Sequence, residues 1–88
     1  MSNYTIVFTD SAVGDIERLD AVVKKRIAKK LKYFVGLEDP LSKAEKLVSS
    51  KIGSYRWRIG DYRVVFDINK YTIVVLRVRH RREAYRSY

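Results

Sequence analysis

Three arginines lie within the most strand-like segment of the chain, SYRWRIGDYRVVF (residues 54–66). Arg56 and Arg58 are two positions apart, and Arg63 follows in the next apolar run. A guanidinium stays protonated at neutral pH, and its fork of donors matches the oxygens of a phosphate or a carboxylate. Alternate positions of a strand point to one face of a sheet, where like charges repel unless an anion lies between them. The spacing therefore predicts an anion-binding sheet face.

A second basic segment, RVRHRREAYRSY (residues 77–88), contains the only histidine of the chain. An imidazole can take up a proton near neutral pH, so His80 could serve as a general base. Tyr85 and Tyr88 would ordinarily be packing or tail residues. The alternative interpretation of both segments is a solvated sheet face with a basic tail.

The charge of the chain is unevenly distributed. Its 88 residues include 19 Lys and Arg against 10 Asp and Glu, which gives a net charge of +9. Residues 51–88 hold ten basic and three acidic residues, a net charge of +7, and eight of the ten arginines. An excess of this size favours a polyanionic or acidic partner, and arginine is the better bidentate ligand for phosphate.

Several classes of protein are excluded by residues that the chain lacks. Without cysteine there are no disulfides and no thiolate metal sites, and no ligand spacing typical of zinc is present. No P-loop or dinucleotide-binding motif is present either. The N-terminus lacks a secretion signal, and no apolar run approaches the roughly 20 residues of a membrane span. We expect a cytoplasmic protein that uses no metal, no cofactor and no membrane.

The first half of the chain predicts a strand followed by a helical hairpin. Residues 3–9 are mainly β-branched and aromatic, which indicates a strand, and Asp10 or Ser11 would cap the next helix. From there apolar residues recur every three or four positions as far as Gly36. A break at residues 19–20 divides this stretch into two helices.

The second half predicts a short helix and three strands. Asp39 is a suitable helix cap and Pro40 a suitable first helical residue, which indicates a helix over Leu41–Leu47. Tight-turn dipeptides then separate three apolar runs, which form an antiparallel meander. The three predicted strands are Tyr55–Ile59, Tyr62–Ile68 and Thr72–Val78.

Alternation along these strands predicts which side chains face the helices. The core side is expected to carry Tyr55, Trp57 and Ile59, then Tyr62, Val64, Phe66 and Ile68, then Val74, Leu76 and Val78. Val75 is expected on the opposite side, with the arginines. The chain is thus predicted to be one α+β domain over residues 1–88. An N-terminal strand and a helical hairpin precede the meander, which forms one sheet with the helices on one face.

Taken together, these elements and the segments KIGSYRWRIGDYRVVFDI and VRHRREAYR resemble the RelE/ParE superfamily of toxins, most closely its RelE branch. The resemblance covers nearly the whole chain. It implies the toxin of a type II toxin-antitoxin system, which enters the ribosomal A site, cleaves mRNA there and inhibits translation. A RelB-like antitoxin, the 70S ribosome and mRNA are the implied partners. Because the toxin is basic, we expect an acidic amphipathic segment in the antitoxin.

The resemblance also implies roles for individual residues. Arg63, Arg81, Tyr85 and His80 are the expected catalytic residues of a metal-independent endoribonuclease, in which a 2′-OH attacks the neighbouring phosphate. Arg63 and Arg81 would stabilise the growing negative charge, and Tyr85 would stack on the substrate nucleotide. The expected RNA-binding residues are Arg56, Arg58, Lys51, Arg77, Arg79, Arg82 and Arg86.

The sequence departs from the family at the position of the base. Arg56 and Arg58 stand where many relatives have lysine, and a guanidinium does not readily release its proton. The base is therefore His80, Tyr85 or no tuned group at all. Two other functions stay open: a ParE-like toxin that inhibits DNA gyrase, and a ribosome- or RNA-binding module that does not cleave.

Overall fold

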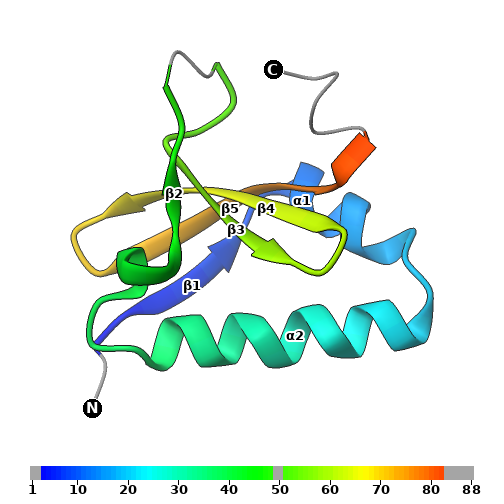
Figure 1. The fold of residues 1–88 in the computed structure, drawn as a ribbon, viewed down its shortest axis with the longest axis horizontal. Coiled ribbons are helices and arrows are strands. Elements are labelled where there is room, and N and C mark those ends of the chain that lie inside the picture. The colour runs from blue at the N-terminus through cyan, green and yellow to red at the C-terminus, as the bar shows by residue number, and fades with distance from the viewer. Residues whose placement is uncertain (1–2, 49–50, 83–88) are drawn as a thin grey trace.

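The computed structural model describes residues 3–48 and 51–82 as an α+β fold (Figure 1). This fold class was predicted from the sequence and is confirmed. The elements in chain order are β1 (Thr5–Phe8), α1 (Asp10–Glu17), α2 (Ala21–Gly36), the 3-10 helix η1 (Pro40–Lys43), β2 (Glu45–Lys46), β3 (Tyr55–Ile59), β4 (Tyr62–Asn69) and β5 (Thr72–His80).

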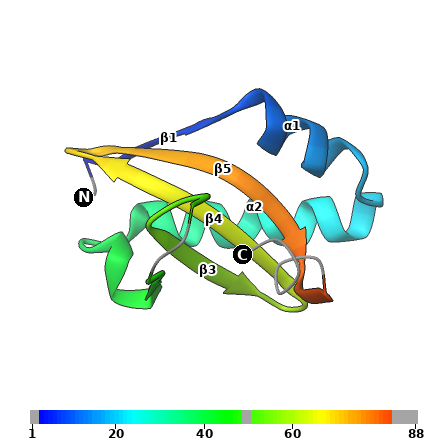
Figure 2. The ribbon, with the colours of Figure 1, turned by 90° about the horizontal axis from the view of Figure 1, so that it is seen from above.

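The predicted meander is the centre of a five-stranded mixed sheet with the order β1-β5-β4-β3-β2. Strands β3, β4 and β5 pair antiparallel, whereas β1 pairs parallel to β5 at one edge. Figure 1 shows α2 running along one side of the sheet, and Figure 2 shows α1 continuing from the end of β1 beside β5. No helix in the described ranges has both the length and the apolar character needed to cross a membrane.

Local signals define both helices of the hairpin. Thr9 caps α1, accepting a hydrogen bond from the backbone N–H of Ala12, so the prediction of Asp10 or Ser11 as the cap was wrong. The Thr9 hydroxyl also donates to the carbonyl of Leu76 (3.0 Å), which ties the start of α1 to β5. Asp20 caps α2 at the predicted break, accepting from the N–H of Val23.

The predicted helix over Leu41–Leu47 was wrong. Asp39 and Pro40 do start a helix, but it is the single 3-10 turn η1, and Ala44 is already extended. Glu45 and Lys46 then form β2 and pair with the outer edge of β3. The helix-forming signals of this short segment are outweighed by strand pairing, because the edge of β3 offers unpaired backbone groups to a neighbouring segment.

The core lies between the sheet and α2 and is centred on Trp57. Its ring stacks between Phe34 of α2 (4.8 Å between centroids) and Phe66 of β4 (3.9 Å). The indole N–H donates to the carbonyl of Pro40 (3.1 Å), so the one polar atom of this buried side chain is satisfied. The predicted assignment of Trp57 to the core is confirmed.

A β-bulge alters the predicted alternation along β5. Phe66 pairs with Val75 and Val65 with Arg77, so Leu76 is an extra residue between these two pairs. Val75 is therefore buried on the helix side with Val78, although it was expected with the arginines. Val74 and Leu76, expected in that core, lie on the opposite side.

Residues on that opposite side are partly covered by the segment that leads into β3. Val65 is fully buried there, and Gly53 packs directly on it. A Cβ at Gly53 would lie 2.8 Å from both the Leu76 Cδ1 and the Val65 Cγ1 atoms, so a larger residue requires these side chains to shift. Ser54 continues the contact, because its N–H donates to Asp67 Oδ1 (2.8 Å).

This close packing predicts opposite effects for two Gly→Ala substitutions. Gly53→Ala should lower the free energy of unfolding by about 1 to 3 kcal/mol, because two side chains must shift. Gly14→Ala is the control: its Cβ meets nothing within 4 Å, and alanine in a helix should stabilise by about 0.5 to 1 kcal/mol. Urea unfolding measures both, and equal effects of the same sign would contradict the packing.

Candidate functional site

The predicted arginines come together on the side of the sheet opposite α2, which we call the arginine face. It carries Arg56, Arg58, Arg63, Arg77 and Arg79. The register places Arg58 opposite Arg63, and Arg63 opposite Arg79, so three arginines form one row across β3, β4 and β5. Arg56, Val65 and Arg77 form the next row.

Arg63 lies in the middle of the first row and is buried, with 6% of its surface exposed. Its Nη1 donates to the carbonyls of Gly60 (3.2 Å) and Tyr62 (3.1 Å), which hold the guanidinium in place. Its Nε and that of Arg56 are buried without an acceptor among the described residues. Donors of this kind are costly in a protein unless an ion or water satisfies them.

Glu45 of β2 supplies the anion that the arginine spacing requires. Its carboxylate receives Arg56 Nη2 on Oε2 (3.2 Å) and Arg58 Nε on Oε1 (2.5 Å). Burial by itself would raise the pKa of Glu45, but hydrogen bonds and the charges of the two arginines outweigh it and lower the pKa below its usual value. An ionised carboxylate is therefore held on the arginine face, with its side chain 43% exposed.

Sequence reasoning missed Glu45 because the predicted helix over Leu41–Leu47 removed it from the sheet. A signal was available, however. Arg56 and Arg58 are like charges on one face of a strand, and such a pair needs an anion nearby. In this fold the nearest edge strand provides it.

His80 lies on the other side of the sheet. It pairs with Tyr62, and the two rings meet edge to face at 5.3 Å between centroids. Its Nδ1 accepts a hydrogen bond from the N–H of Arg82 (3.3 Å), so the proton of the neutral ring is on Nε2. Strand alternation thus directs His80 away from the row of Arg58, Arg63 and Arg79.

Arg81 marks the end of the sheet next to the β3–β4 turn. Its N–H donates to the carbonyl of Asp61 (2.6 Å), and its guanidinium lies 3.9 Å from the Asp61 carboxylate. Asp61, His80, Arg81 and Arg82 line a polar cavity of about 610 Å³ at this end. Arg81 is 57% exposed in its side chain, so it can reach a bound anion.

Arg77 has a different environment from the one predicted. Its Nε and Nη2 donate to the two oxygens of Asp15 in α1 (2.8 and 2.9 Å), and the N–H of Val78 donates to the same carboxylate (2.9 Å). Burial alone would raise the pKa of Asp15, but these hydrogen bonds and the charges of Arg77 and Arg79 lower it overall. Arg77 thus fastens α1 to β5.

Of the other predicted site residues, three lie within the described ranges and two do not. Lys51 and Arg82 are exposed, and Arg79 is half-buried. Tyr85 and Arg86 lie outside the described residues. Within the part of the chain that is described, no cluster of His, Cys, Asp and Glu side chains could hold a metal ion.

The sequence also matches a known protein family. The model of the ParE toxins of type II toxin-antitoxin systems, parDE, matches residues 6–85. The chain belongs to this toxin family. Its predicted place in the RelE/ParE superfamily is thereby confirmed, and it is the toxin of a type II toxin-antitoxin system.

Solved structures similar to the toxin are toxin-antitoxin complexes. The RelBE2 complex from Mycobacterium tuberculosis is 30% identical, with 91% of this chain and 93% of that chain covered and a TM-score of 0.72. The RelB-RelE complex from Methanococcus jannaschii is 25% identical, with 93% and 98% covered and a TM-score of 0.70. The archaeal RelE-RelB complex from Pyrococcus horikoshii OT3, 24% identical over 89% and 94% with a TM-score of 0.70, supports the fold alone. A comparison with curated proteins finds no significant match.

The environment of Asp15 predicts a pH-dependent contribution to stability. Because its pKa is lower in the folded toxin than in the unfolded chain, the contribution is present above the unfolded pKa of about 3.9 and is lost as the pH falls through the folded pKa. Asp15→Asn should therefore lower the free energy of unfolding at pH 7 by about 3 kcal/mol or more, since the ion pair between the buried Asp15 carboxylate and Arg77 is broken.

Urea unfolding at pH 7 and at several values below pH 4 measures this contribution, and the difference between wild type and variant should shrink only in the acid range. Asp61→Asn is the control, because its ion pair with Arg81 is long and exposed and should contribute less than about 1 kcal/mol. A loss in Asp15→Asn no larger than in this control would contradict the interpretation.

Proposed function

We propose that the toxin is a ribosome-dependent endoribonuclease that cleaves mRNA in the A site and so inhibits translation in the cytoplasm. The observation that carries the proposal is the row of Arg58, Arg63 and Arg79 with the ionised carboxylate of Glu45 beside it. Cleavage of RNA without a metal needs donors for the charge on the phosphate, a base for the 2′-OH and an acid for the leaving 5′-oxygen. The row of arginines and Glu45 would supply the first two.

In the proposed reaction Glu45 takes the proton of the 2′-OH, and the 2′-oxygen attacks the adjacent phosphorus. The bond to the 5′-oxygen breaks, which gives a cyclic phosphate and a free 5′-OH. Arg63 and Arg81 stabilise the negative charge that grows on the phosphate oxygens. Tyr85 is the candidate for the group that protonates the 5′-oxygen, and it also stacks on the substrate nucleotide.

Glu45 replaces His80 as the proposed base for a geometric reason. The Glu45 carboxylate lies against the arginines that would hold the phosphate, whereas His80 pairs with Tyr62 on the helix side. Its two arginine neighbours keep it ionised, although they also make it a weaker base. Part of the rate would therefore come from the positioning of the RNA by the ribosome.

The proposed partners follow from charge and from similarity. Arg56, Arg58, Lys51, Arg79, Arg82 and Arg86 are the proposed contacts to mRNA on the 70S ribosome, and Arg77 is left out because it is bound to Asp15. The proposed antitoxin is RelB-like, because the similar solved structures are complexes with RelB.

Cleavage of ribosome-bound mRNA, mapped by primer extension in a purified translation reaction, tests the proposal. The wild-type toxin should cut within the A-site codon, and Arg81→Ala should lose about 10² to 10³ in rate because a donor to the phosphate is removed. Lys25→Ala is a control, since this exposed residue of α2 lies on the helix side of the sheet and the substitution changes the charge equally.

Intact mRNA with the wild-type toxin would contradict the nuclease proposal. A second candidate is then inhibition of DNA gyrase, which the match to the ParE family model favours. Gyrase-dependent DNA damage supports this candidate. Slowed translation with intact mRNA and intact DNA would instead indicate a binding module without cleavage.

The role of Glu45 gives a separate prediction. Glu45→Gln keeps the size of the side chain but cannot accept the proton, so the rate should fall by about 10² to 10⁴. In wild type the rate should not decline between pH 8 and pH 6, because the lowered pKa keeps the carboxylate ionised. An imidazole base would instead lose rate below about pH 6.5.

Single-turnover cleavage of mRNA on stalled ribosomes at several pH values measures both effects. Glu38→Gln, at an exposed acidic residue, is the control and should cleave like wild type. His80→Gln distinguishes the two candidate bases. If it removes the acid limb of a wild-type profile while Glu45→Gln cleaves normally, Glu45 is not the base.

A further inference from the structure

The turn between β3 and β4 is hydrogen-bonded to both arginines that would stabilise the charge on the phosphate. It consists of Gly60 and Asp61, and Tyr62 begins β4. The backbone carbonyls of Gly60 and Tyr62 accept from Arg63 Nη1 at 3.2 and 3.1 Å. The carbonyl of Asp61, between them, accepts from the backbone N–H of Arg81 at 2.6 Å. Three consecutive carbonyls therefore hold two arginines that are distant in the sequence.

These contacts fix the arginines without neutralising them. A carbonyl carries no net charge, so the buried Arg63 keeps its full charge. Only Nη1 of its guanidinium is bound to the turn, so the rest of the group is not committed to it. Arg81 is bound through its backbone, and its side chain, which is 57% exposed, is not held by this bond. Charge stabilisation depends on donors that are already in place when the reaction starts.

The conformation of Gly60 sets the direction of these carbonyls. Its φ is +58°, in the left-handed region, where a residue with a side chain is strained and glycine is not. A Cβ at this position would have Arg26 Nη1 as its nearest neighbour, at 3.7 Å, which is an ordinary contact. A larger residue therefore fits in space, and the backbone would have to leave this conformation to relieve the strain.

The turn at the opposite end of β4 has the same backbone conformation but a different environment. Lys70 is the first residue after β4, as Gly60 is the first after β3, and its φ is +56°. Figure 2 shows the two turns at opposite ends of β4. The carbonyl of Tyr71 accepts from the N–H of Thr5 (2.8 Å), which joins this turn to β1. Lys70 is thus a matched control for Gly60, away from the arginines.

We propose that Gly60 is a positioning residue of the cleavage site, because its left-handed backbone aims the three carbonyls that hold Arg63 and Arg81. The two arginines then approach one phosphate as a unit, and a change in the turn displaces both. The inference rests on the proposed function, in which both guanidiniums stabilise the charge on the phosphate. It goes further in assigning their placement to a residue that touches no substrate.

Single-turnover cleavage of mRNA on stalled ribosomes by two proline variants tests the proposal. Gly60→Pro and Lys70→Pro both force φ from its positive value to about −65°. Gly60→Pro should cleave about 30-fold or more slowly than wild type, because misplaced donors cost rate. Lys70→Pro should cleave within about threefold of wild type. Both variants should bind the ribosome within about threefold of wild type, since the arginine side chains are all retained.

Urea unfolding establishes that each variant is folded at the assay temperature. Where Gly60→Pro does not fold, Gly60→Ala and Lys70→Ala make the same comparison with less strain, and Gly60→Ala should then be about tenfold slower. Gly60→Asn separates conformation from side chain. Asparagine adopts the left-handed region more readily than most residues, so this variant should cleave within about fivefold of wild type.

Two outcomes of the cleavage assay would overturn the proposal. If Gly60→Pro cleaves like wild type, or if Lys70→Pro loses as much rate, Gly60 does not position the arginines. Equal losses in Gly60→Asn and Gly60→Pro would show that the backbone conformation of the turn is not what matters.

NMR of the free toxin keeps the positioning separate from RNA cleavage. Hydrogen exchange of the Arg81 amide and of the Arg63 guanidinium should be slow in wild type and in Lys70→Pro, and about tenfold or more faster in Gly60→Pro. If wild type shows this protection but does not cleave mRNA, the proposed function fails and the positioning stands. Unchanged exchange in Gly60→Pro overturns the positioning whether or not the toxin cleaves.

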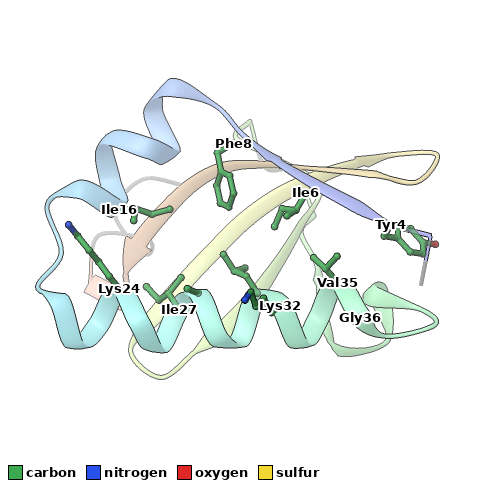
Figure 3. A pocket seen from close by; sticks show the side chains of 11 residues that line it. Tyr4, Ile6, Phe8, Ile16, Lys24, Ile27, Lys32, Val35 and Gly36 are labelled. Carbon is green, nitrogen blue, oxygen red and sulfur yellow. The ribbon is translucent and has the colours of Figure 1, made fainter. Parts of the chain in front are cut away.

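A groove on the other side of the sheet reports on the rest of the fold. It lies between β1 and α2, has a volume of about 750 Å³ and is lined mainly by apolar side chains, among them Ile16 of α1 and Val35 of α2 (Figure 3). None of the lining residues belongs to the turn. The methyl signals of Ile16 and Val35 should therefore be the same in wild type and in both proline variants. A shift of these signals in Gly60→Pro alone would assign the lost rate to a wider rearrangement and overturn the role of the turn.

Discussion

Repulsion between neighbouring guanidiniums is the constraint on which this structure depends. Five arginines share one face of three adjacent strands, and two carboxylates from outside the meander offset their charge. Glu45 reaches in from β2 at one edge, and Asp15 reaches in from α1 at the other. The same ion pairs attach α1 and β2 to the sheet. They therefore stabilise the fold and also reduce the repulsion between the arginines of the site.

The two carboxylates differ in their exposure to solvent. Asp15 is almost fully buried and receives two guanidinium donors and a backbone N–H, which suits a permanent structural contact. Glu45 is 43% exposed, so it can also meet a substrate, and its donors among the described residues are Arg56 and Arg58. Between them Arg63 is held by backbone carbonyls, which fixes its position without neutralising its charge.

The two sides of the sheet have separate tasks. On one side the stack of Phe34, Trp57 and Phe66 makes a rigid support, because close-packed aromatic rings resist displacement. On the other side the arginines project from that support at positions set by the strand register. The groove beside α2 belongs to the supporting side, opposite the arginine face.

The sequence by itself determined the strands of the meander, the break at Asp20, the burial of Trp57 and the shared face of the arginines. These depend on periodicities of two and 3.6 residues and on caps, which act over a few neighbours. Only the tertiary structure decided the bulge at Leu76, the pairing of Glu45 and Lys46 with β3, and the contact of Arg77 with Asp15. Each of these depends on contacts between segments that are distant in the sequence. The residue pattern of a short segment does not specify such contacts.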